Sequence, residues 1–292
     1  MAKIAIVGVG AIGAVVAAIL QSSGRHEILL CTRRSLAELV VDTPDGQVRV
    51  DATVVTSPAK AFAVDWVLVA TKAYDVAGAS AWLPQLRASG APVAVLQNGV
   101  EHRERFAPWL PPDAILPVIV DCPAERKSPE RVVQRGGMTL KVPSGSLGDA
   151  FVRLFAGTSA DAAAVPDFLT AAWRKLCLNA AGVLPALLLQ PAGVMRDDAI
   201  AEVAIQIVSE CVEVGRAEGA QLDDTIPEAV LNAYRAQPPD SLNSLHADRL
   251  AGRPMEIDAR NGVVVRMGRK HGIPTPTNSM AVALLEAMVR NT

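Results

Sequence analysis

In the first half of the chain, short apolar runs alternate with longer segments of helical periodicity. The continuous apolar runs at 3–9, 26–32 and 65–70 predict buried strands, and the run at 11–24 predicts a helix ending at its terminal glycine. A helical stretch to about residue 86 follows. Further strands are predicted at 48–55, 92–96, 114–120 and 138–143. Strands alternating with helices predict parallel βαβ units in a doubly wound α/β sheet.

The second half of the chain has a different pattern. From about Ala160 the periodicity is helical almost to the end, and Gly272 followed by Pro274 predicts a helix C-terminus. The helical segments are 167–184, 198–219, 226–236 and 256–272. We therefore expect two domains, 1–165 and 166–292. With no low-complexity linker in view, we expect them to pack closely, with a cleft between them.

Composition narrows the class of protein. Half of the 292 residues are hydrophobic and a fifth are charged, which is typical of a globular chain. The formal net charge of -2 and the 4% aromatic content argue against nucleic-acid and anionic-membrane partners. The four cysteines are scattered, and no cysteine or histidine spacing indicates a metal site. Because no signal peptide or spanning segment is apparent, we expect a cytoplasmic protein with reduced thiols.

The segment GVGAIG follows the first predicted strand and opens the first predicted helix. Gly8 would let the strand turn tightly, Gly10 would let a pyrophosphate approach the backbone, and Gly13 would let helix and strand pack closely. At the helix start, Ala11 and Ile12 would offer N–H groups and a partial positive charge to phosphates. The pattern predicts a dinucleotide site, with a plain glycine-rich turn as the alternative.

The end of the second strand reads Cys31-Thr32-Arg33-Arg34. A site for NAD usually carries a carboxylate here, whereas a guanidinium suits the 2′-phosphate of NADP. We therefore expect NADP(H), bound through Arg33 or Arg34. A solvated basic turn is the alternative.

Polar residues also follow two other predicted strands. Lys72 comes after the strand ending at Ala70, and Asn98 after the strand ending at Leu96. In a parallel sheet these ends share an edge with the glycine segment. Lys72 would bind cofactor oxygens near the nicotinamide, and Asn98 would bind cofactor or substrate. A plain turn at Asn98-Gly99 remains equally open.

The helical half contains further candidate chemistry. Lys175 and Asn179 are four residues apart, so a helix presents them on one face, where an ammonium and an amide would suit a carbonyl substrate. An exposed lysine on an amphipathic helix is the alternative. Ser244 would serve as a helix cap, and Glu256 and Asp258 as first-turn carboxylates, on local grounds alone.

Taken together, these motifs resemble the ketopantoate reductase (2-dehydropantoate 2-reductase) family over nearly the whole chain. The elements that carry the resemblance are GVGAIG at 8–13, Arg33, TK at 71–72, QNG at 97–99, WRKLCLN at 173–179, Ser244, and EID-x-x-N-G at 256–262. The resemblance implies an N-terminal Rossmann domain, a C-terminal helical domain and an active site between them. It also implies NADPH-dependent reduction of ketopantoate to pantoate, on the route to coenzyme A.

The resemblance also implies residue roles. Lys175 would be the general acid that protonates the ketone oxygen, and Glu256 would hold the substrate's hydroxyl groups. Asn98, Asn179 and Ser244 would be polar anchors for the 2-oxo acid. On the cofactor side, Lys72 would line the site and Arg33 would meet the 2′-phosphate.

The chain departs from the family pattern at a few positions. Val183 stands one turn beyond Asn179, where the family carries a second asparagine, and His246-Ala247 stand where it has leucine and glutamine. A reductase of another 2-oxo acid is therefore an alternative, as is an NADP(H)-binding sensor without turnover. The apolar C-terminal helices would serve a homodimer interface or a domain core.

Overall fold

The computed structural model describes residues 1–290, with side chains for residues 1–288. The chain forms two compact units. The first contains residues 1–97 and 102–168, and the second contains the short segment 98–101 and the chain from Leu169 onward. The expected boundary after residue 165 lies three residues before this division. The segment 98–101, which contains the candidate site residue Asn98, thus belongs to the second unit.

The first unit is built on a six-stranded sheet with every neighbouring pair parallel. In spatial order the strands are β5 (Thr53–Val55), β2 (His26–Cys31), β1 (Ala2–Val7), β6 (Trp66–Val69), β7 (Val93–Val95) and β8 (Ile115–Pro117). Numbered along the chain within this sheet, the order is 3-2-1-4-5-6, that of a doubly wound dinucleotide-binding fold. The predicted fold class is confirmed.

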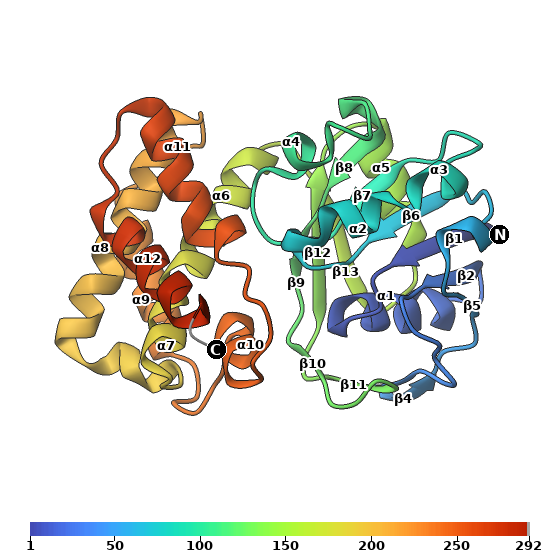
Figure 1. Ribbon diagram of the computed structural model, residues 1–292, viewed down its shortest axis with the longest axis horizontal. Coiled ribbons are helices and arrows are strands. Elements are labelled where there is room, and N and C mark those ends of the chain that lie inside the picture. Colours follow the sequence, from blue (N-terminus) through green and yellow to red (C-terminus); the bar gives the residue numbers. More distant parts are fainter. Residues whose placement is uncertain (291–292) are drawn as a thin grey trace. The chain divides into compact units, whose positions relative to one another are not determined.

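Helices cover both faces of this sheet (Figure 1). On one face, Ile4 and Ile6 of β1 pack with α1 (Ala11–Ser22) in one apolar cluster. On the other face, Ala5 and Val7 belong to a second cluster. That second cluster includes residues of α2 (Val76–Ser80), α3 (Leu83–Leu86) and α4 (His102–Phe106). Because both faces are buried, the strands read as continuous apolar runs rather than alternating ones.

Two smaller sheets complete the first unit. One has the order β10 (Ala124–Arg126), β11 (Arg131–Gln134), β3 (Val40–Thr43), β4 (Gly46–Arg49). The other has the order β13 (Ala160–Val165), β12 (Met138–Pro143), β9 (Ile119–Asp121), and α5 (Ser146–Leu154) connects β12 to β13. The remaining short helices are η1 (Pro58–Lys60), η2 (Ala73–Asp75) and η3 (Pro112–Ala114).

Two expectations about this region were wrong. The helical pattern was expected from about Ala160, but residues 160–165 form β13, which pairs with β12 along its whole length. Its alanine-rich sequence carries no strand signal, so tertiary pairing decides its structure. The single strand expected at 114–120 is divided, because β8 joins the large sheet and β9 joins the three-stranded one.

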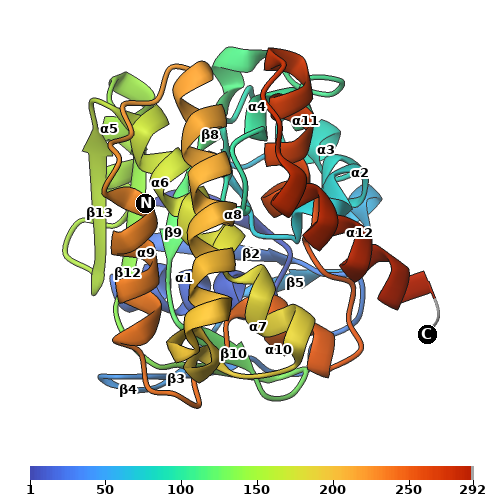
Figure 2. The same ribbon diagram turned by 90° about the vertical axis from the view of Figure 1, so that its left-hand side faces the viewer.

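Within its described part, the regular secondary structure of the second unit is helical. Its helices are α6 (Phe168–Ala181), α7 (Val183–Leu188), η4 (Ala192–Arg196), α8 (Asp198–Ala217), α9 (Ile226–Arg235), α10 (Ser244–Leu250), the π-helix η5 (Asp258–Gly262), α11 (Val263–His271) and α12 (Pro276–Arg290). Figure 2 shows α8 running between α9 and α11, and α8 contacts both of them. Gly272 ends α11 in the left-handed conformation, φ +68°, as predicted.

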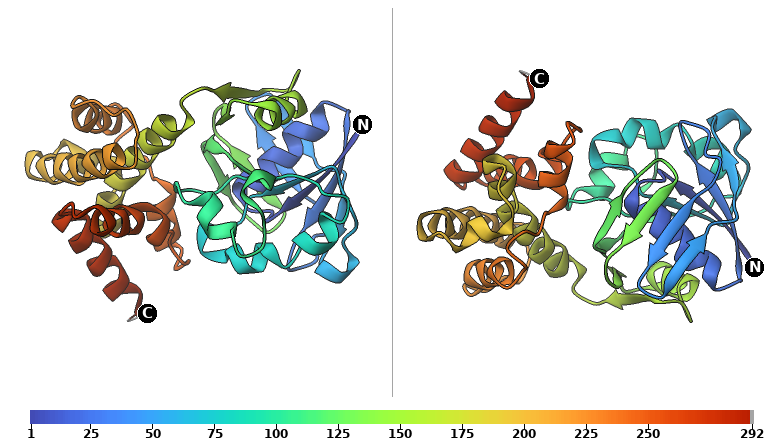
Figure 3. Two further views of the ribbon diagram at one scale, coloured as in Figure 1. Left: turned by 90° about the horizontal axis from the view of Figure 1, so that it is seen from above. Right: turned by 90° about the horizontal axis from the view of Figure 1, so that it is seen from below.

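The last helix of the second unit is only partly covered. In both views of Figure 3, the C-terminal part of α12 extends beyond the other helices of its unit. Met280 and Leu284, one turn apart on this helix, are exposed. Across the described residues, no helix combines the length and apolar character needed to cross a bilayer.

Candidate active site

The glycine segment has the geometry that its spacing predicts. Gly8 directly follows β1 with φ +94°, and a Cβ there would lie 2.6 Å from Cγ2 of Thr71. A Cβ on Gly13 would collide with the carbonyl oxygen of Gly8. A Cβ on Gly10, in contrast, would meet no atom within 4 Å. Gly8 and Gly13 are therefore required by the fold, whereas Gly10 borders open space that a ligand backbone or phosphate can approach.

The N-terminus of α1 lies at this open space. Gly10 is its N-cap and has no side chain to satisfy the first-turn N–H groups. The first intrahelical bond runs from the N–H of Ala14 to the oxygen of Gly10, 3.0 Å, so Ala11, Ile12 and Gly13 precede it. Free N–H groups and the positive end of the helix dipole suit an anion such as a pyrophosphate. This local structure fits the predicted dinucleotide.

The basic pair after β2 is exposed. The Arg33 side chain is 82% exposed, and its Nη1 lies 3.4 Å from Oδ2 of Asp75. Arg34 is also exposed, and its carbonyl oxygen accepts a hydrogen bond from the Thr32 hydroxyl, 2.6 Å. An exposed ion pair of this kind contributes about 0–1 kcal/mol. Arg33 is therefore lightly held and available to another anion.

The strand ends predicted to share an edge do so. Because β1, β6 and β7 are adjacent, Thr71 at the end of β6 contacts the glycine segment. The Gln97 amide nitrogen donates to Oγ1 of Thr71, 2.9 Å, and to the carbonyl oxygen of Lys72, 3.3 Å. The backbone carbonyl oxygen of Gln97 in turn lies within hydrogen-bond distance of Nε2 of His102, 2.8 Å. Gln97 and His102 are buried, and sequence reasoning did not identify their hydrogen bonds to this edge of the sheet. Lys72 is half-buried.

Three predicted side chains from distant parts of the chain meet in the second unit. Asn98 donates from Nδ2 to Oε2 of Glu256, 2.9 Å, and its Oδ1 accepts from Nδ2 of Asn179, 3.3 Å. Glu256 is only 4% exposed. We refer to these three residues as the amide–carboxylate cluster. The structure assigns Asn98 to the second unit, and its expected cofactor contact stays a prediction.

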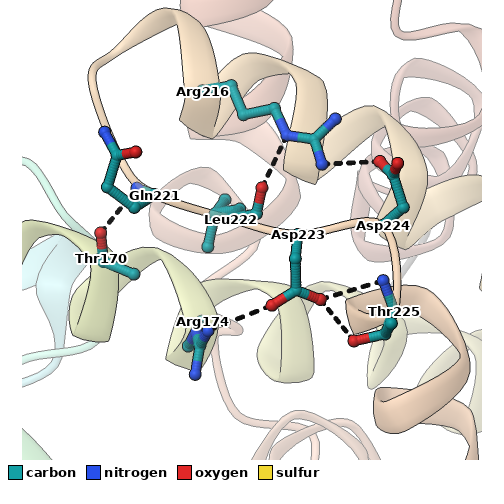
Figure 4. A network of polar contacts seen from close by, with 8 residues as sticks. All are labelled: Thr170, Arg174, Arg216, Gln221, Leu222, Asp223, Asp224 and Thr225. Carbon is teal, nitrogen blue, oxygen red and sulfur yellow. Dashed lines mark hydrogen bonds and ion pairs between the residues drawn. The ribbon is translucent and has the colours of Figure 1, made fainter.

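Lys175 lies on α6, one turn before Asn179, and is half-buried. The neighbouring Arg174 serves a different purpose, since its Nη2 lies 3.3 Å from Oδ2 of Asp223 (Figure 4). Hydrogen bonds from Thr225, together with the charge of Arg174, lower the pKa of Asp223. Figure 4 shows that the loop at 221–225 is hydrogen-bonded to both α6 and α8. The backbone N–H of Gln221 donates to the Thr170 hydroxyl on α6. Arg216 on α8 donates to the carbonyl oxygen of Leu222 and to the carboxylate of Asp224. Arg174 is thus engaged by Asp223, whereas the role expected of Lys175 stays a prediction.

The segment carrying Asn98 contacts the rest of the second unit at two further residues, Glu101 and Gly99. Glu101 accepts from Nη2 of Arg266, 2.6 Å, and from its Nε, 3.4 Å. Gly99 has φ +106°, and a Cβ there would lie 2.9 Å from the carbonyl oxygen of Ala259. The Glu101–Arg266 pair was not found from sequence, because its members are 165 residues apart and no motif links them.

One local expectation for Ser244 was wrong. Asn243, not Ser244, caps α10, because its Oδ1 accepts from the N–H of His246, 3.0 Å. The Ser244 hydroxyl instead accepts from Nη2 of Arg260, 2.7 Å. Ser244 is exposed and makes no hydrogen bond to the amide–carboxylate cluster within the described side chains.

The π-helix η5 positions the residues after Glu256. Its wide turn is closed by the N–H of Gly262 bonding the oxygen of Ile257, 3.0 Å. Asn261, fully buried, donates to the carbonyl oxygen of Ala180 on α6, 3.1 Å, and to Oδ1 of Asn278, 2.9 Å. These bonds fix η5 against the end of α6 that carries Asn179. Such π-bulges recur at functional sites.

Val183, which departs from the family pattern, belongs to the apolar core. It is fully buried among the cluster that holds Trp173 and Leu184. His246, the other departure, is 1% exposed and has both ring nitrogens buried without a hydrogen-bond partner. Burial, with the nearby charge of Arg249, lowers the pKa of His246.

Comparison with known proteins agrees with this geometry. Residues 4–146 match the family described as "Ketopantoate reductase PanE/ApbA", and residues 167–289 match "Ketopantoate reductase PanE/ApbA C terminal". The chain is 49% identical to a 2-dehydropantoate 2-reductase of Caulobacter vibrioides, over 98% of this chain and 99% of that protein.

Solved structures show the same fold. A PanE/ApbA family ketopantoate reductase from Ralstonia eutropha is 30% identical, covers 99% of each chain and has a TM-score of 0.89. A D-mandelate dehydrogenase, solved with NADH and anilino(oxo)acetate, is 22% identical with a TM-score of 0.87 over 99% of this chain and 98% of that one. The chain is thus an oxidoreductase, and it belongs to the ketopantoate reductase family.

Proposed function

We propose that this protein reduces 2-dehydropantoate (ketopantoate) to pantoate with NADPH. The observation that carries the proposal is the amide–carboxylate cluster of Asn98, Asn179 and Glu256, one helical turn from Lys175. Ketopantoate offers a ketone, a carboxylate and a hydroxyl group. A buried carboxylate and two amides provide both donors and acceptors for such a molecule.

The cofactor is expected on the glycine segment of the first unit. The N–H groups of Ala11, Ile12 and Gly13 would hold its phosphates beside Gly8 and Gly10, and Lys72 would bind oxygens nearer the nicotinamide. Arg33 would exchange its exposed contact with Asp75 for the 2′-phosphate, which offers a stronger, charge-assisted partner. We also expect Asn98 to contact the cofactor. When bound, the reduced nicotinamide supplies the hydride.

The residues of the second unit would handle the carbonyl group. As the ketone becomes an alcohol, negative charge develops on its oxygen. The Lys175 ammonium stabilises that charge and donates the proton. Glu256 accepts hydrogen bonds from the substrate's hydroxyl groups, and Asn98, Asn179 and Ser244 anchor its remaining polar atoms. Asn98 fixes the position of the Glu256 carboxylate before substrate arrives, because it already donates to it.

A related reductase acting on another 2-oxo acid is the second candidate. The observation that favours it is Val183, which is buried in the core and supplies no hydrogen bond where the family pattern has an asparagine. A site without one hydrogen-bond partner can prefer a substrate without the corresponding group. A non-catalytic NADP(H) sensor is the third, and the placement of Lys175 beside the cluster argues against it.

We also propose a homodimer in the cytoplasm. Met280 and Leu284 form an exposed apolar pair on α12, which a second copy would cover. The four cysteines are free thiols, which would suit a reducing compartment. Light scattering of the wild-type chain and of Leu284→Glu tests the dimer: a monomeric variant supports it, and a monomeric wild type contradicts it.

Steady-state oxidation of NADPH by the purified protein tests the main proposal. Ketopantoate, 2-oxoisovalerate and 2-oxobutanoate are compared as substrates, with NADH replacing NADPH in a parallel series. The proposal predicts the highest kcat/KM with ketopantoate and a strong preference for NADPH. Higher kcat/KM with another 2-oxo acid would favour the second candidate, and NADPH binding without turnover would favour the sensor.

A further inference from the structure

Arg126 brings a positive charge to the glycine segment of the first unit. It is the last residue of β10, and its Nη1 donates to the carbonyl oxygen of Val9, which stands between Gly8 and Gly10. The strand β10 and its neighbour β11 also contact α1, the helix that follows this segment. The bond joins residues 117 apart in sequence, so no local motif indicates it.

The guanidinium of Arg126 has neutral partners only. Its other two hydrogen bonds also go to carbonyl oxygens, from Nε to Ser128, 3.1 Å, and from Nη2 to Pro129. Within residues 1–288, no carboxylate oxygen lies within ion-pair distance, 4.0 Å, of this side chain. Burial lowers the pKa of the half-buried Arg126, and the charge of Glu130 acts in the opposite direction. Because arginine stays protonated in proteins, the charge persists without a paired anion.

The same guanidinium has donors left over. Arginine carries five N–H groups in a planar fork, and the three bonds to carbonyl oxygens account for three of them. The two that remain lie on Nη1 and Nη2, and the bond to Val9 fixes Nη1 beside the glycine segment. A fork of this kind, with a full positive charge, suits the oxygens of a phosphate group.

The glycine segment has no full positive charge of its own. Neither residues 8–13 nor the rest of the first turn of α1 contains a charged side chain. The end of a helix contributes the equivalent of roughly half an elementary charge, whereas a dinucleotide carries a negative charge on each phosphate of its pyrophosphate. The helix dipole therefore leaves most of that charge unbalanced, and Arg126 could balance a further part of it.

We propose that Arg126 is a further cofactor-binding residue, which contacts the pyrophosphate beside Gly10 while its bond to Val9 holds the glycine segment in place. The space next to Gly10 is open, since a Cβ there would meet no atom within 4 Å. This inference rests on the proposed function, because it concerns the same dinucleotide. It assigns a different part of the cofactor from the 2′-phosphate expected at Arg33, so the two arginines are tested separately.

The test compares two ligands that differ in the pyrophosphate. NADPH contains it, whereas adenosine 2′-monophosphate has the adenosine and the 2′-phosphate without it. Dissociation constants are measured by calorimetry for wild type, Arg126→Gln and Arg126→Lys. Glutamine keeps an N–H donor for the oxygen of Val9 but removes the charge. Arg131→Gln is the matched control, because Arg131 lies on the neighbouring β11 but pairs through Nε with Oδ2 of Asp42, 2.7 Å.

We expect Arg126→Gln to weaken NADPH binding about tenfold, the lower end of the range for one charge-assisted hydrogen bond, because solvent screens a half-buried charge. Binding of adenosine 2′-monophosphate should stay unchanged, and Arg131→Gln should leave both ligands unaffected. Arg126→Lys restores the charge without the planar fork and should regain part of the NADPH affinity. Equal losses on both ligands would indicate a purely structural role and overturn the inference, as would unchanged NADPH binding in Arg126→Gln.

The two proposals fail in different ways. If wild type reduces ketopantoate with NADPH but Arg126→Gln binds NADPH equally well, the pyrophosphate contact is wrong and the reductase stands. If wild type binds NADH and not NADPH, the proposed cofactor is wrong. Weaker NADH binding in Arg126→Gln, and not in Arg131→Gln, then leaves the pyrophosphate contact standing. If circular dichroism shows that Arg126→Gln does not fold, Arg126→Lys decides, and an unchanged ratio of the two affinities overturns the inference.

Discussion

The two units present their candidate chemistry in opposite ways. In the first unit the cofactor site is made mainly of backbone, and Gly8, Gly10 and Gly13 lie within six consecutive residues. In the second unit the site is made of side chains, and Asn98, Asn179 and Glu256 come from segments far apart in sequence.

This difference predicts which kind of substitution should damage each site most. A backbone site depends on steric space, so added atoms should damage it more than lost charges. A side-chain cluster depends on hydrogen bonds held in place by partners such as Glu101–Arg266, so lost charges should damage it more. The predictions below use this difference, beginning with the largest expected effect.

Replacing Lys175 by alanine should remove the general acid and lower kcat by about 10²- to 10⁴-fold. NADPH affinity, measured by fluorescence titration, should stay within about twofold, because the glycine segment is untouched. Arg174→Ala is the control. Arg174 makes a solvent-exposed ion pair with Asp223, and such pairs contribute little, so kcat should hardly change. Equal losses of kcat in both variants would contradict the assigned role.

Gly13→Ala and Gly10→Ala separate steric demands of the fold from those of the cofactor. A Cβ on Gly13 collides with the carbonyl oxygen of Gly8, so the free energy of unfolding should fall by about 1–3 kcal/mol. Gly10→Ala meets no protein atom, so stability should change by about 0.5 kcal/mol or less. NADPH affinity should still fall about tenfold or more in Gly10→Ala, because the methyl group occupies phosphate space. Unchanged affinity would place the pyrophosphate elsewhere.

Arg33→Ser should reduce the preference for NADPH over NADH about 10- to 100-fold, through loss of charge-assisted bonds to the 2′-phosphate. The ratio of kcat/KM for the two cofactors measures this preference. Arg34→Ser is the matched control and should leave the ratio nearly unchanged. If Arg34→Ser has the larger effect, the phosphate contact belongs to Arg34.

Glu101→Gln should loosen the segment that carries Asn98, because it weakens the contact with Arg266. We expect kcat/KM for ketopantoate to fall about tenfold with NADPH affinity unchanged, since misplacing a substrate contact slows the reaction. Glu218→Gln is the control, because Glu218 is similarly covered but pairs with Lys270, 2.8 Å. A loss of the same size in the control would indicate a general effect of removing an ion pair.

The smallest effect should come from His246. Burial lowers the pKa of His246 in the folded protein, so the unfolded chain takes up the proton first as pH falls. Stability is therefore complete above about pH 6.5, the unfolded value, and declines below it. His246→Leu should reduce this decline between pH 7 and pH 5, as measured by chemical unfolding at each pH. An identical decline in the variant would show that another group is responsible.

The comparison of the two units also shows what sequence can reveal. The glycine segment and the parallel order of the large sheet were predictable, because local spacing and continuous apolar runs determine them. Lys175 and Asn179 were paired correctly on α6 by helical periodicity. The strand β13 was not predicted, because its alanine-rich sequence has low strand propensity and it forms a strand only by pairing with β12.

The residues of the second unit that support the candidate site were harder to predict from sequence. Arg260, Asn261 and the Glu101–Arg266 pair act through contacts between distant segments and carry no motif that assigns them a partner. Ser244 looked like a helix cap because serine often caps, and only the structure shows that Asn243 does so. Roles of this kind follow from three-dimensional neighbours rather than from residue type.

The central claim is that the chain transfers hydride from NADPH to the ketone of ketopantoate. Mass spectrometry of the product tests it most directly, with NADPH carrying deuterium at both positions of nicotinamide C4. The account predicts pantoate that is one mass unit heavier than the unlabelled product, with the deuterium at the carbon that bore the ketone. Absence of pantoate, or pantoate without deuterium, would contradict it.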